Sequence, residues 1–341
     1  MRSVLPDKRV FTQDPKDPAF IQNPYALYEK FHAVGGPIFW SNYHTWCLAG
    51  FDDVYRTLQD KRFKRLKPAE TQTNDSKPHL ADFNRVEQFS LLGLEAPEHT
   101  RIRKRINAAF MSRKVLQMRD TISATAESLI DQFEPQGSVE LLQHYATPLP
   151  LSIITKLLGV PISAGAHLLA WSHAMVRVYT MTQTHDDEQQ ANQAAAEFEA
   201  FLFEQIALRR ERAGDDLLSA LVNDTDNNAL SDAEIVSTCV LLLNAGHEAT
   251  VHQIGNAVRT LLQQVDNPAD CFHDDATSDA TVSELLRYDA PLHLFLRYAH
   301  EDIQLHPDVT LARGEPVALL LGAANRDPSR FSHANQFNPA R

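Results

Sequence analysis

One long stretch, Ser231 to Val265, constrains the fold of this chain more than any other. Ser231 followed three residues later by Glu234 forms a capping box, which marks the start of a helix. The next break comes at Asp266-Asn267-Pro268. A helix of that length measures about 50 Å, enough to cross a whole domain. Residues 239–243 are apolar without interruption, which is typical of a helix buried on every side.

The middle of this helix carries residues that a buried helix normally avoids. Asn244, Gly246, His247 and Glu248 follow directly on the apolar run. A glycine inside a helix costs about 1 kcal/mol relative to alanine, and an unpaired buried carboxylate costs several. We therefore expect these residues to have a function that outweighs their cost to stability.

Two interpretations of the stretch carry equal weight on these residues alone. In the first, Ala245 and Gly246 form a notch against which a flat ligand lies, since neither has a bulky side chain. Glu248 is then a proton carrier beside the notch, and Thr250 bonds back to the Gly246 carbonyl. In the second, small residues allow two helices to cross closely, and Glu248 pairs with an arginine elsewhere.

Composition and patterning predict a single mainly α domain over residues 1–341, because helical periodicity dominates and no Gly/Ser linker divides the chain. The net charge is −12 and basic clusters are short, which argues against nucleic-acid binding. No signal peptide or membrane anchor is expected from the N-terminal residues. The cysteines Cys47, Cys239 and Cys271 lack metal-site spacing, so we expect a reduced, cytoplasmic protein in which none of these three binds a metal.

The remaining elements follow from caps, breakers and periodicity. A helix after Pro24 ends at Gly35-Gly36-Pro37, and a hairpin spans Ile38 to Leu48. Strands after Arg297 complete a small β region. One further helix is expected to begin at Pro97, and another to end near Asp289. The other expected helices span Asp52 to Asp60, Lys114 to Phe133, His144 to Leu158, Ser163 to Thr180, Gln190 to Arg212 and Asp215 to Val222. Lys64 to Phe89 is predicted to be a long loop with at most short helices, and Thr182 to Glu188 a structureless acidic tip, either a moving lid or a solvated turn.

Two further pairs are weak signals when each is taken alone. Glu284 and Arg287 lie three apart on a helix, where an exposed pair stabilises by about 0.3 kcal/mol. His99 and Arg103 lie four apart, hence on one helix face, which is also what a solvated face would show.

Together and in this order, the motifs resemble those of the heme-thiolate monooxygenases, the cytochrome P-450 superfamily, in its soluble bacterial form. Residues 245–250 (Ala-Gly-His-Glu-Ala-Thr) are similar to the family's oxygen-binding helix, and Glu284-x-x-Arg287 to its ExxR pair. Residues 97–103 resemble the helix that binds a heme propionate. Arg297 falls where a second propionate-binding arginine is expected, and residues 325–328 (Asn-Arg-Asp-Pro) match the segment before the meander. The resemblance covers about residues 23–341.

The resemblance implies a cytochrome P-450 fold and a set of site residues. His99, Arg103 and Arg297 would bind the propionates of heme b through charge-assisted hydrogen bonds. Ala245 and Gly246 would lie where dioxygen binds, with Glu248 and its neighbours Ala249 and Thr250 in the proton relay. Glu284 and Arg287 would form a buried structural pair that holds the meander.

The chain departs from the family pattern in two places. The family usually has Thr or Ser after the acid, whereas this chain has Ala249; Thr250 is one place further, turned by about 100° around the helix. The family's axial cysteine belongs in a Gly-rich loop after the Phe-x-Pro meander, and it is expected beyond Arg341 together with the helix that follows it. None of the three cysteines occupies such a loop. The thiolate supplies the electron push for O–O cleavage.

The resemblance therefore implies one of two functions. The chain is either part of a bacterial monooxygenase that oxidises a small apolar substrate with electrons from a ferredoxin-type donor, C-terminally incomplete and inactive as it stands. Or it is a non-enzymatic binding or partner protein of P-450 type that has lost the heme-ligand loop. We expect a monomer in either case.

Overall fold

The computed structural model describes residues 7–71, 77–110, 114–180 and 183–341. The chain forms two compact units. The sheet unit comprises residues 1–73 and 256–341, and the helical unit comprises residues 74–255. The prediction of a single domain is not tested by this division and stays a prediction.

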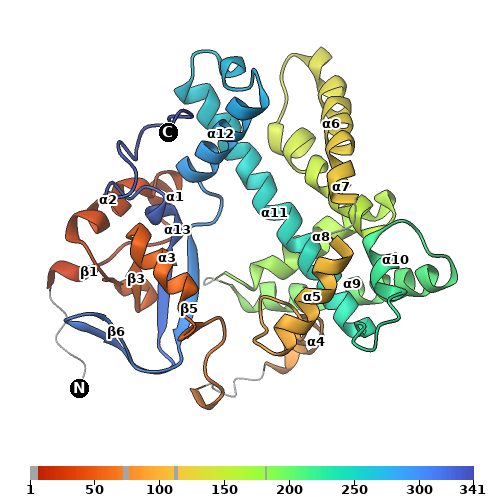
Figure 1. Cartoon of the computed structure of the whole chain (residues 1–341), viewed down its shortest axis with the longest axis horizontal. Coiled ribbons are helices and arrows are strands. Elements are labelled where there is room, and N and C mark those ends of the chain that lie inside the picture. Colours follow the sequence, from red (N-terminus) through yellow and green to blue (C-terminus); the bar gives the residue numbers. More distant parts are fainter. Residues whose placement is uncertain (1–6, 72–76, 111–113, 181–182) are drawn as a thin grey trace. The chain divides into compact units, whose positions relative to one another are not determined.

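The sheet unit is built on a mixed six-stranded sheet with strand order β1-β2-β3-β8-β5-β4 (Figure 1). A separate two-stranded sheet pairs β6 with β7. The strands are β1 (Val10–Phe11), β2 (Ile38–Trp40), β3 (Thr45–Leu48), β4 (Phe63–Lys64), β5 (Leu294–Ala299), β6 (Ile303–His306), β7 (Val309–Leu311) and β8 (Pro316–Leu320). The helices are α1 (Pro18–Gln22), α2 (Tyr25–Val34), α3 (Phe51–Gln59), α12 (Asp275–Tyr288) and α13 (Leu321–Ala324).

The predicted hairpin of the sheet unit is confirmed. β2 and β3 pair antiparallel with Trp40 opposite Thr45, and His44 takes a left-handed conformation (φ 48°) at the end of the connecting turn. β3 also pairs in parallel with β8, so that Trp46 lies opposite Val317. β8 is buried from its second residue on, which fits a strand at the centre of a sheet.

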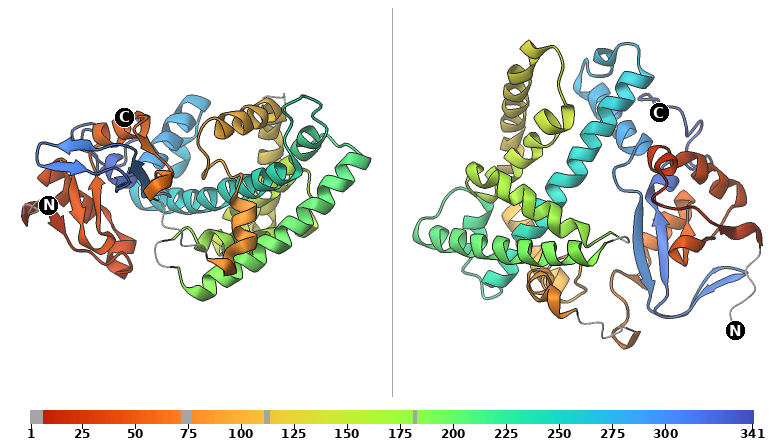
Figure 2. Two further views of the ribbon diagram at one scale, coloured as in Figure 1. Left: turned by 90° about the horizontal axis from the view of Figure 1, so that it is seen from below. Right: turned by 180° about the vertical axis from the view of Figure 1, so that it is seen from behind.

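The helical unit is assembled around α9 (His185–Glu211), which packs against α8 (Gly165–Arg177) and α4 (Ala81–Glu87) (Figure 2). Its core includes Leu168, Phe198 and Leu202, all fully buried. The other helices of the unit are α5 (Glu98–Phe110), α6 (Lys114–Phe133), α7 (Pro148–Leu158) and α10 (Leu217–Val222). The mainly α class with a small β region is thus confirmed.

The prediction of a structureless tip over residues 182–188 is wrong in its described part. Thr184 caps α9, and its hydroxyl and the Asp187 carboxylate exchange hydrogen bonds with each other's backbone amides (3.2 Å and 2.9 Å). This capping box makes residues 185–188 the first turn of a helix. Acidic residues favour that position because they interact well with the positive end of the helix dipole. Thr182 lies outside the described residues.

The long helix predicted from Ser231 onward is α11 (Asp232–Gln264). Its capping box forms as expected: the Ser231 amide donates to Glu234 Oε2 (2.8 Å), and the Glu234 amide donates to Ser231 Oγ (3.4 Å). Residues 232–255 belong to the helical unit, and the rest of the helix belongs to the sheet unit. Among the described residues, no helix is long and apolar enough to cross a membrane.

Candidate active site

The middle of α11 has the notch that the first interpretation of the sequence requires. Leu243 is fully buried, whereas Ala245 and Gly246, directly after Asn244, are exposed. A Cβ atom placed on Gly246 would lie 3.4 Å from Cδ1 of Ile154 on α7, so the small residues also allow α7 to approach. The helix therefore presents bare backbone on one side at this point.

Two polar side chains flank the notch. The Thr250 hydroxyl donates to the Gly246 carbonyl oxygen (3.1 Å), as the sequence predicted, so its proton is engaged with the helix backbone. Glu248 is half-buried and makes no hydrogen bond or ion pair with any residue that the structure describes. The interpretation in which an arginine neutralises Glu248 therefore has no support within the described ranges. Ala249, half-buried, brings no hydroxyl.

Asn244 and His247 are buried on α11 without hydrogen-bond partners among the described residues. The ring of His247 lies 5.8 Å, centroid to centroid, from that of His173 on α8. Burial, together with the nearby His173 and His252, lowers the pKa of His247 to about 4, so this imidazole is neutral near pH 7. Sequence reasoning noticed these residues as anomalies but had no signal for their missing partners, because partners are set by tertiary packing.

Glu284 and Arg287 form the buried pair that the resemblance implied, here within the sheet unit. Arg287 donates from Nε and Nη2 to the two Glu284 carboxylate oxygens (2.7 Å and 2.8 Å). Its Nη1 donates to the carbonyl oxygens of Asn325 (2.8 Å) and Ala334 (2.9 Å). The amide of Asn338 donates to Glu284 Oε1 (2.9 Å). Both side chains are buried, so the pair fastens α12 to the segment that follows α13.

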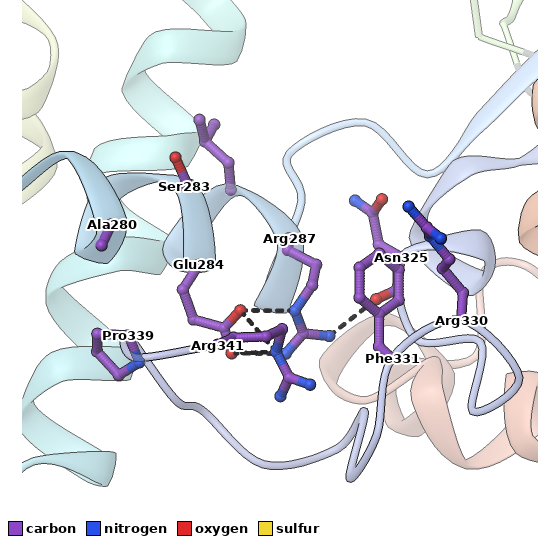
Figure 3. A pocket seen from close by; sticks show the side chains of 10 residues that line it. Ala280, Ser283, Glu284, Arg287, Asn325, Arg330, Phe331, Pro339 and Arg341 are labelled. Atoms are coloured by element: carbon purple, nitrogen blue, oxygen red, sulfur yellow. Dashed lines mark hydrogen bonds and ion pairs between the residues drawn. The ribbon is translucent and has the colours of Figure 1, made fainter.

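Arg341 is a third member of this cluster that sequence reasoning missed. Its Nε lies 3.2 Å from Glu284 Oε2, and its guanidinium also donates to backbone carbonyls in residues 332–336. Figure 3 shows both arginines directed at the Glu284 carboxylate. Burial alone would raise the pKa of Glu284, but hydrogen bonds from Arg287, the Asn338 amide and Arg341 lower it below its usual range. The only sequence signal for this contact was the presence of an arginine shortly after Pro339, in the segment that the Glu284–Arg287 pair was expected to hold.

A pocket of about 710 Å³ lies beside this pair. Arginine side chains, an aromatic ring and small residues share its lining, which comprises Ala280, Ser283, Glu284, Leu286, Arg287, Asn325, Arg330, Phe331, Pro339 and Arg341 (Figure 3). The carboxylate of the pair is already saturated by donors, so the pocket exposes positive rather than catalytic groups.

The residues predicted to bind propionates are placed as follows. His99 and Arg103 lie one turn apart on α5, half-buried and exposed respectively. Arg297 lies on β5, half-buried, and donates to the Leu296 carbonyl oxygen (2.9 Å). The first two belong to the helical unit and the third to the sheet unit. Their chemistry suits carboxylates, and their joint action on one ligand stays a prediction.

The cysteines do not suit the iron of a heme. Burial raises the pKa of the Cys47 thiol, on β3, to about 12, and the thiol donates to the Thr45 carbonyl oxygen (3.7 Å). Burial likewise raises the pKa of Cys239, inside α11, to about 12. A metal ligand must be the thiolate, which both environments disfavour. Cys271, half-buried, sits in a single 3₁₀ turn (Pro268–Cys271). The exposed notch of α11 is open to a flat ligand such as a porphyrin, but no described cysteine is suited to bind its iron.

The chain combines a mainly α fold and a small mixed sheet with a long notched helix and a buried Glu-Arg pair. This combination is typical of one class of heme proteins, and comparison with known proteins identifies the family. A family profile described as Cytochrome P450 matches residues 276–341. "Biotin biosynthesis cytochrome P450" of Bacillus subtilis (strain 168) is 32% identical over 94% of this chain and 81% of its own length. "Cytochrome P450 monooxygenase PikC" of Streptomyces venezuelae is 32% identical over 94% of this chain and 75% of its own. The chain belongs to the cytochrome P450 family.

Solved structures of the family agree with this assignment. The structure of P450BioI in complex with hexadec-9Z-enoic acid ligated acyl carrier protein superposes with a TM-score of 0.87 at 30% identity, over 95% of this chain and 84% of that one. The predicted cytochrome P-450 fold of bacterial type is therefore confirmed.

Proposed function

We propose that the chain is the scaffold of a bacterial heme-dependent monooxygenase that acts on a small apolar substrate. The observation that carries the proposal is the exposed Ala245-Gly246 notch in α11 beside Glu248, a carboxylate with no partner among the described residues. A half-buried acid without a partner costs free energy, so its position indicates use. The fatty acyl chain named for the P450BioI structure supports an apolar substrate.

Heme b, when bound, supplies the oxygen chemistry, and the residues of this chain hold and serve it. His99, Arg103 and Arg297 bind the propionates through charge-assisted hydrogen bonds. Glu248 takes up and passes protons at the notch. Ala249 cannot assist, and the Thr250 hydroxyl is held by the Gly246 carbonyl. A water molecule or a substrate hydroxyl therefore takes the place of the side-chain hydroxyl that residue 249 lacks.

The proposal includes a ferredoxin-type electron donor, a monomeric state and a cytoplasmic location. It also includes the inactivity of the chain as printed, because no described cysteine is suited to bind the iron as thiolate. A chain extended by a Gly-rich cysteine loop would carry the ligand.

The same observation on the cysteines favours a second candidate. A P450-type protein without a thiolate ligand would bind a small molecule or a partner and catalyse nothing. The two candidates differ in what the natural gene product contains, and one measurement separates them.

The experiment is intact mass spectrometry of the natural gene product together with its absorption spectrum when reduced under carbon monoxide. A longer product with the thiolate-type spectrum supports the monooxygenase. A product of the printed length that lacks this spectrum supports the binding protein. For the printed chain, weak heme binding without the thiolate signature is expected, and a full thiolate signature at stoichiometric heme would contradict the assignment of the cysteines.

The role of Glu248 has its own test in a product that carries the thiolate. Glu248→Gln keeps the shape and removes the proton carrier, so turnover should fall by about 10²–10⁴-fold, the range typical of general acid–base groups. Substrate affinity should stay nearly unchanged. Unaltered turnover and unaltered peroxide leakage would remove Glu248 from the mechanism. Ala249→Thr is the companion variant, and it should be tolerated or disturb substrate binding through its bulk.

A further inference from the structure

Three side chains with metal-binding donors meet within the helical unit, away from α11. His79 lies in a 3₁₀ turn (Pro78–Leu80), and His185 and Glu188 lie in the first turn of α9. His79 Nε2 is 2.7 Å and His185 Nδ1 is 3.9 Å from Glu188 Oε2. One ligand atom from each of the three side chains lies within 4.8 Å of the others. The two imidazole rings are 4.6 Å apart, centroid to centroid.

We propose that His79, His185 and Glu188 bind a divalent transition-metal ion of the Zn²⁺ type. Two imidazoles and one carboxylate form a donor set that zinc uses with a fourth position left for water. Tetrahedral coordination at about 2.1 Å places neighbouring ligand atoms about 3.4 Å apart. The two distances to Glu188 Oε2 lie on either side of that value, so small side-chain rotations complete the geometry.

The electrostatics of the cluster keep the carboxylate ready to act as a ligand. The Lys77 ammonium forms an ion pair with Glu188 Oε1, which leaves Oε2 facing the two histidines. Hydrogen bonds from Lys77 and then from His79 lower the pKa of Glu188 below its usual range, so it is ionised near pH 7. The Glu188 side chain is only 7% exposed, whereas His185 is 65% exposed. An ion thus has an open path from solvent to a sheltered anionic oxygen.

Binding would join two segments that are distant in the sequence. α4 is already fixed to α9, because the Asn192 side-chain oxygen accepts from the amides of Asp82 (2.8 Å) and Phe83 (3.1 Å). The Asn192 side-chain nitrogen donates in turn to the Asp82 carboxylate (2.9 Å). A metal ion at Glu188 adds a cross-link one helical turn earlier on α9, between its start and the turn that leads into α4.

The test is isothermal titration of the tag-free full chain with ZnCl₂, in a buffer that does not bind zinc. We expect one equivalent to bind to wild type. Changes outside the first ligands cost about 10–100-fold in affinity, so loss of a ligand in His79→Gln, His185→Gln or Glu188→Gln should cost more than about 100-fold. His185 is exposed, so His185→Gln removes a ligand without loss of a folded core.

Two further variants make the test specific. His273→Gln is the matched control, because His273 also faces a carboxylate (Asp274, 3.3 Å) but belongs to no described three-ligand cluster. Its affinity for Zn²⁺ should equal that of wild type. Lys77→Met removes a positive charge next to the ion and should tighten binding several-fold. Unchanged binding in His185→Gln, unchanged binding in Lys77→Met, or no binding to wild type would each overturn the proposal.

Thermal melting gives an independent readout. A ligand that binds only the folded state raises the melting temperature as its concentration rises. Zn²⁺ should raise that of wild type and His273→Gln but not that of His185→Gln. The measurement needs no heme, so its failure is distinct from failure of the proposed monooxygenase function.

Discussion

The Glu284–Arg287 cluster and the centre of α11 solve the problem of burying polar groups in opposite ways. Two arginines and a backbone amide donate to the Glu284 carboxylate. The remaining N–H groups of Arg287 donate to backbone carbonyl oxygens. At the centre of α11, Asn244 and His247 are equally buried and have no partners among the described residues. A saturated cluster has nothing left to offer a ligand, whereas an unsaturated one does.

The comparison distinguishes buried polar groups that stabilise the fold from buried polar groups that remain available to a ligand. Removing one member of a buried pair is strongly destabilising because it leaves an uncompensated charge. An unpartnered buried polar group already costs about 1–3 kcal/mol, so its removal should stabilise the fold. The three substitutions that follow test this difference through the free energy of unfolding.

The largest effect is expected for Arg287→Ala. The change leaves Glu284 buried with a single arginine and frees the carbonyls of residues 325 and 334, so it should cost about 3–5 kcal/mol, a large part of a domain's stability. Soluble yield and urea unfolding measure this loss. Arg210→Ala is the control, since Arg210 pairs with Asp232 in the open and should cost no more than about 1 kcal/mol. Wild-type melting of Arg287→Ala would place the pair outside the core.

The next effect has the opposite sign. His247→Leu replaces an unpartnered buried imidazole with an apolar side chain of similar size and should stabilise by about 1–3 kcal/mol. His252→Leu, exposed five residues later on the same helix, should change stability by no more than about 0.5 kcal/mol. Equal or lower stability of His247→Leu would mean that the imidazole is satisfied in solution.

The pH dependence sharpens this prediction. The pKa of His247 is about 4 in the folded chain, against about 6.5 when unfolded. Between these values the unfolded chain binds more protons, so the cost of burying the neutral His247 imidazole grows, and stability falls, as the pH drops from about 6.5 toward 4. Urea unfolding across this range should therefore show a shallower slope with pH for His247→Leu than for wild type.

The smallest effect is expected for Glu248→Gln. Glu248 is half-buried and has no described ion pair to lose, so the free energy of unfolding of the variant should equal that of wild type or exceed it by no more than about 0.5 kcal/mol. A loss of stability as large as that of Arg287→Ala would mean that Glu248 has an arginine partner. It would then favour the interpretation in which the small residues allow two helices to cross.

Local signals in the sequence predicted the parts of the fold that local physics determines. The Ser231–Glu234 capping box, the Gly35 stop and the 38–48 hairpin all lie where expected, because caps and turns depend on neighbours along the chain. The parallel pairing of β3 with β8 could not be predicted, because nothing in the sequence of either strand indicates which strand it pairs with. The start of α9 was predicted too late, because a run of acidic residues is typical both of an exposed lid or turn and of the first turn of a helix.

The candidate site divides in the same manner. The Gly246 notch, the Thr250 back-bond and the Glu284–Arg287 pair were predicted from spacing and resemblance, and their geometry is observed. Arg341, the missing partners of Asn244, and the meeting of His79 with α9 depend on contacts between distant segments. A single sequence does not encode such contacts in any local pattern.

The interleaving of the sheet unit has a consequence for the ribosome. Strands β2 and β3 emerge early, yet β8, the parallel neighbour of β3, and β5, which pairs with β8, are made only after the whole helical unit has been translated. At about 5–20 residues per second, β3 remains without its parallel partner for tens of seconds, with one edge open. The helical unit is continuous in the sequence over residues 74–255, and it emerges complete during that interval. The nascent chain therefore closes its first-made sheet last, and the early hairpin keeps an open strand edge until then.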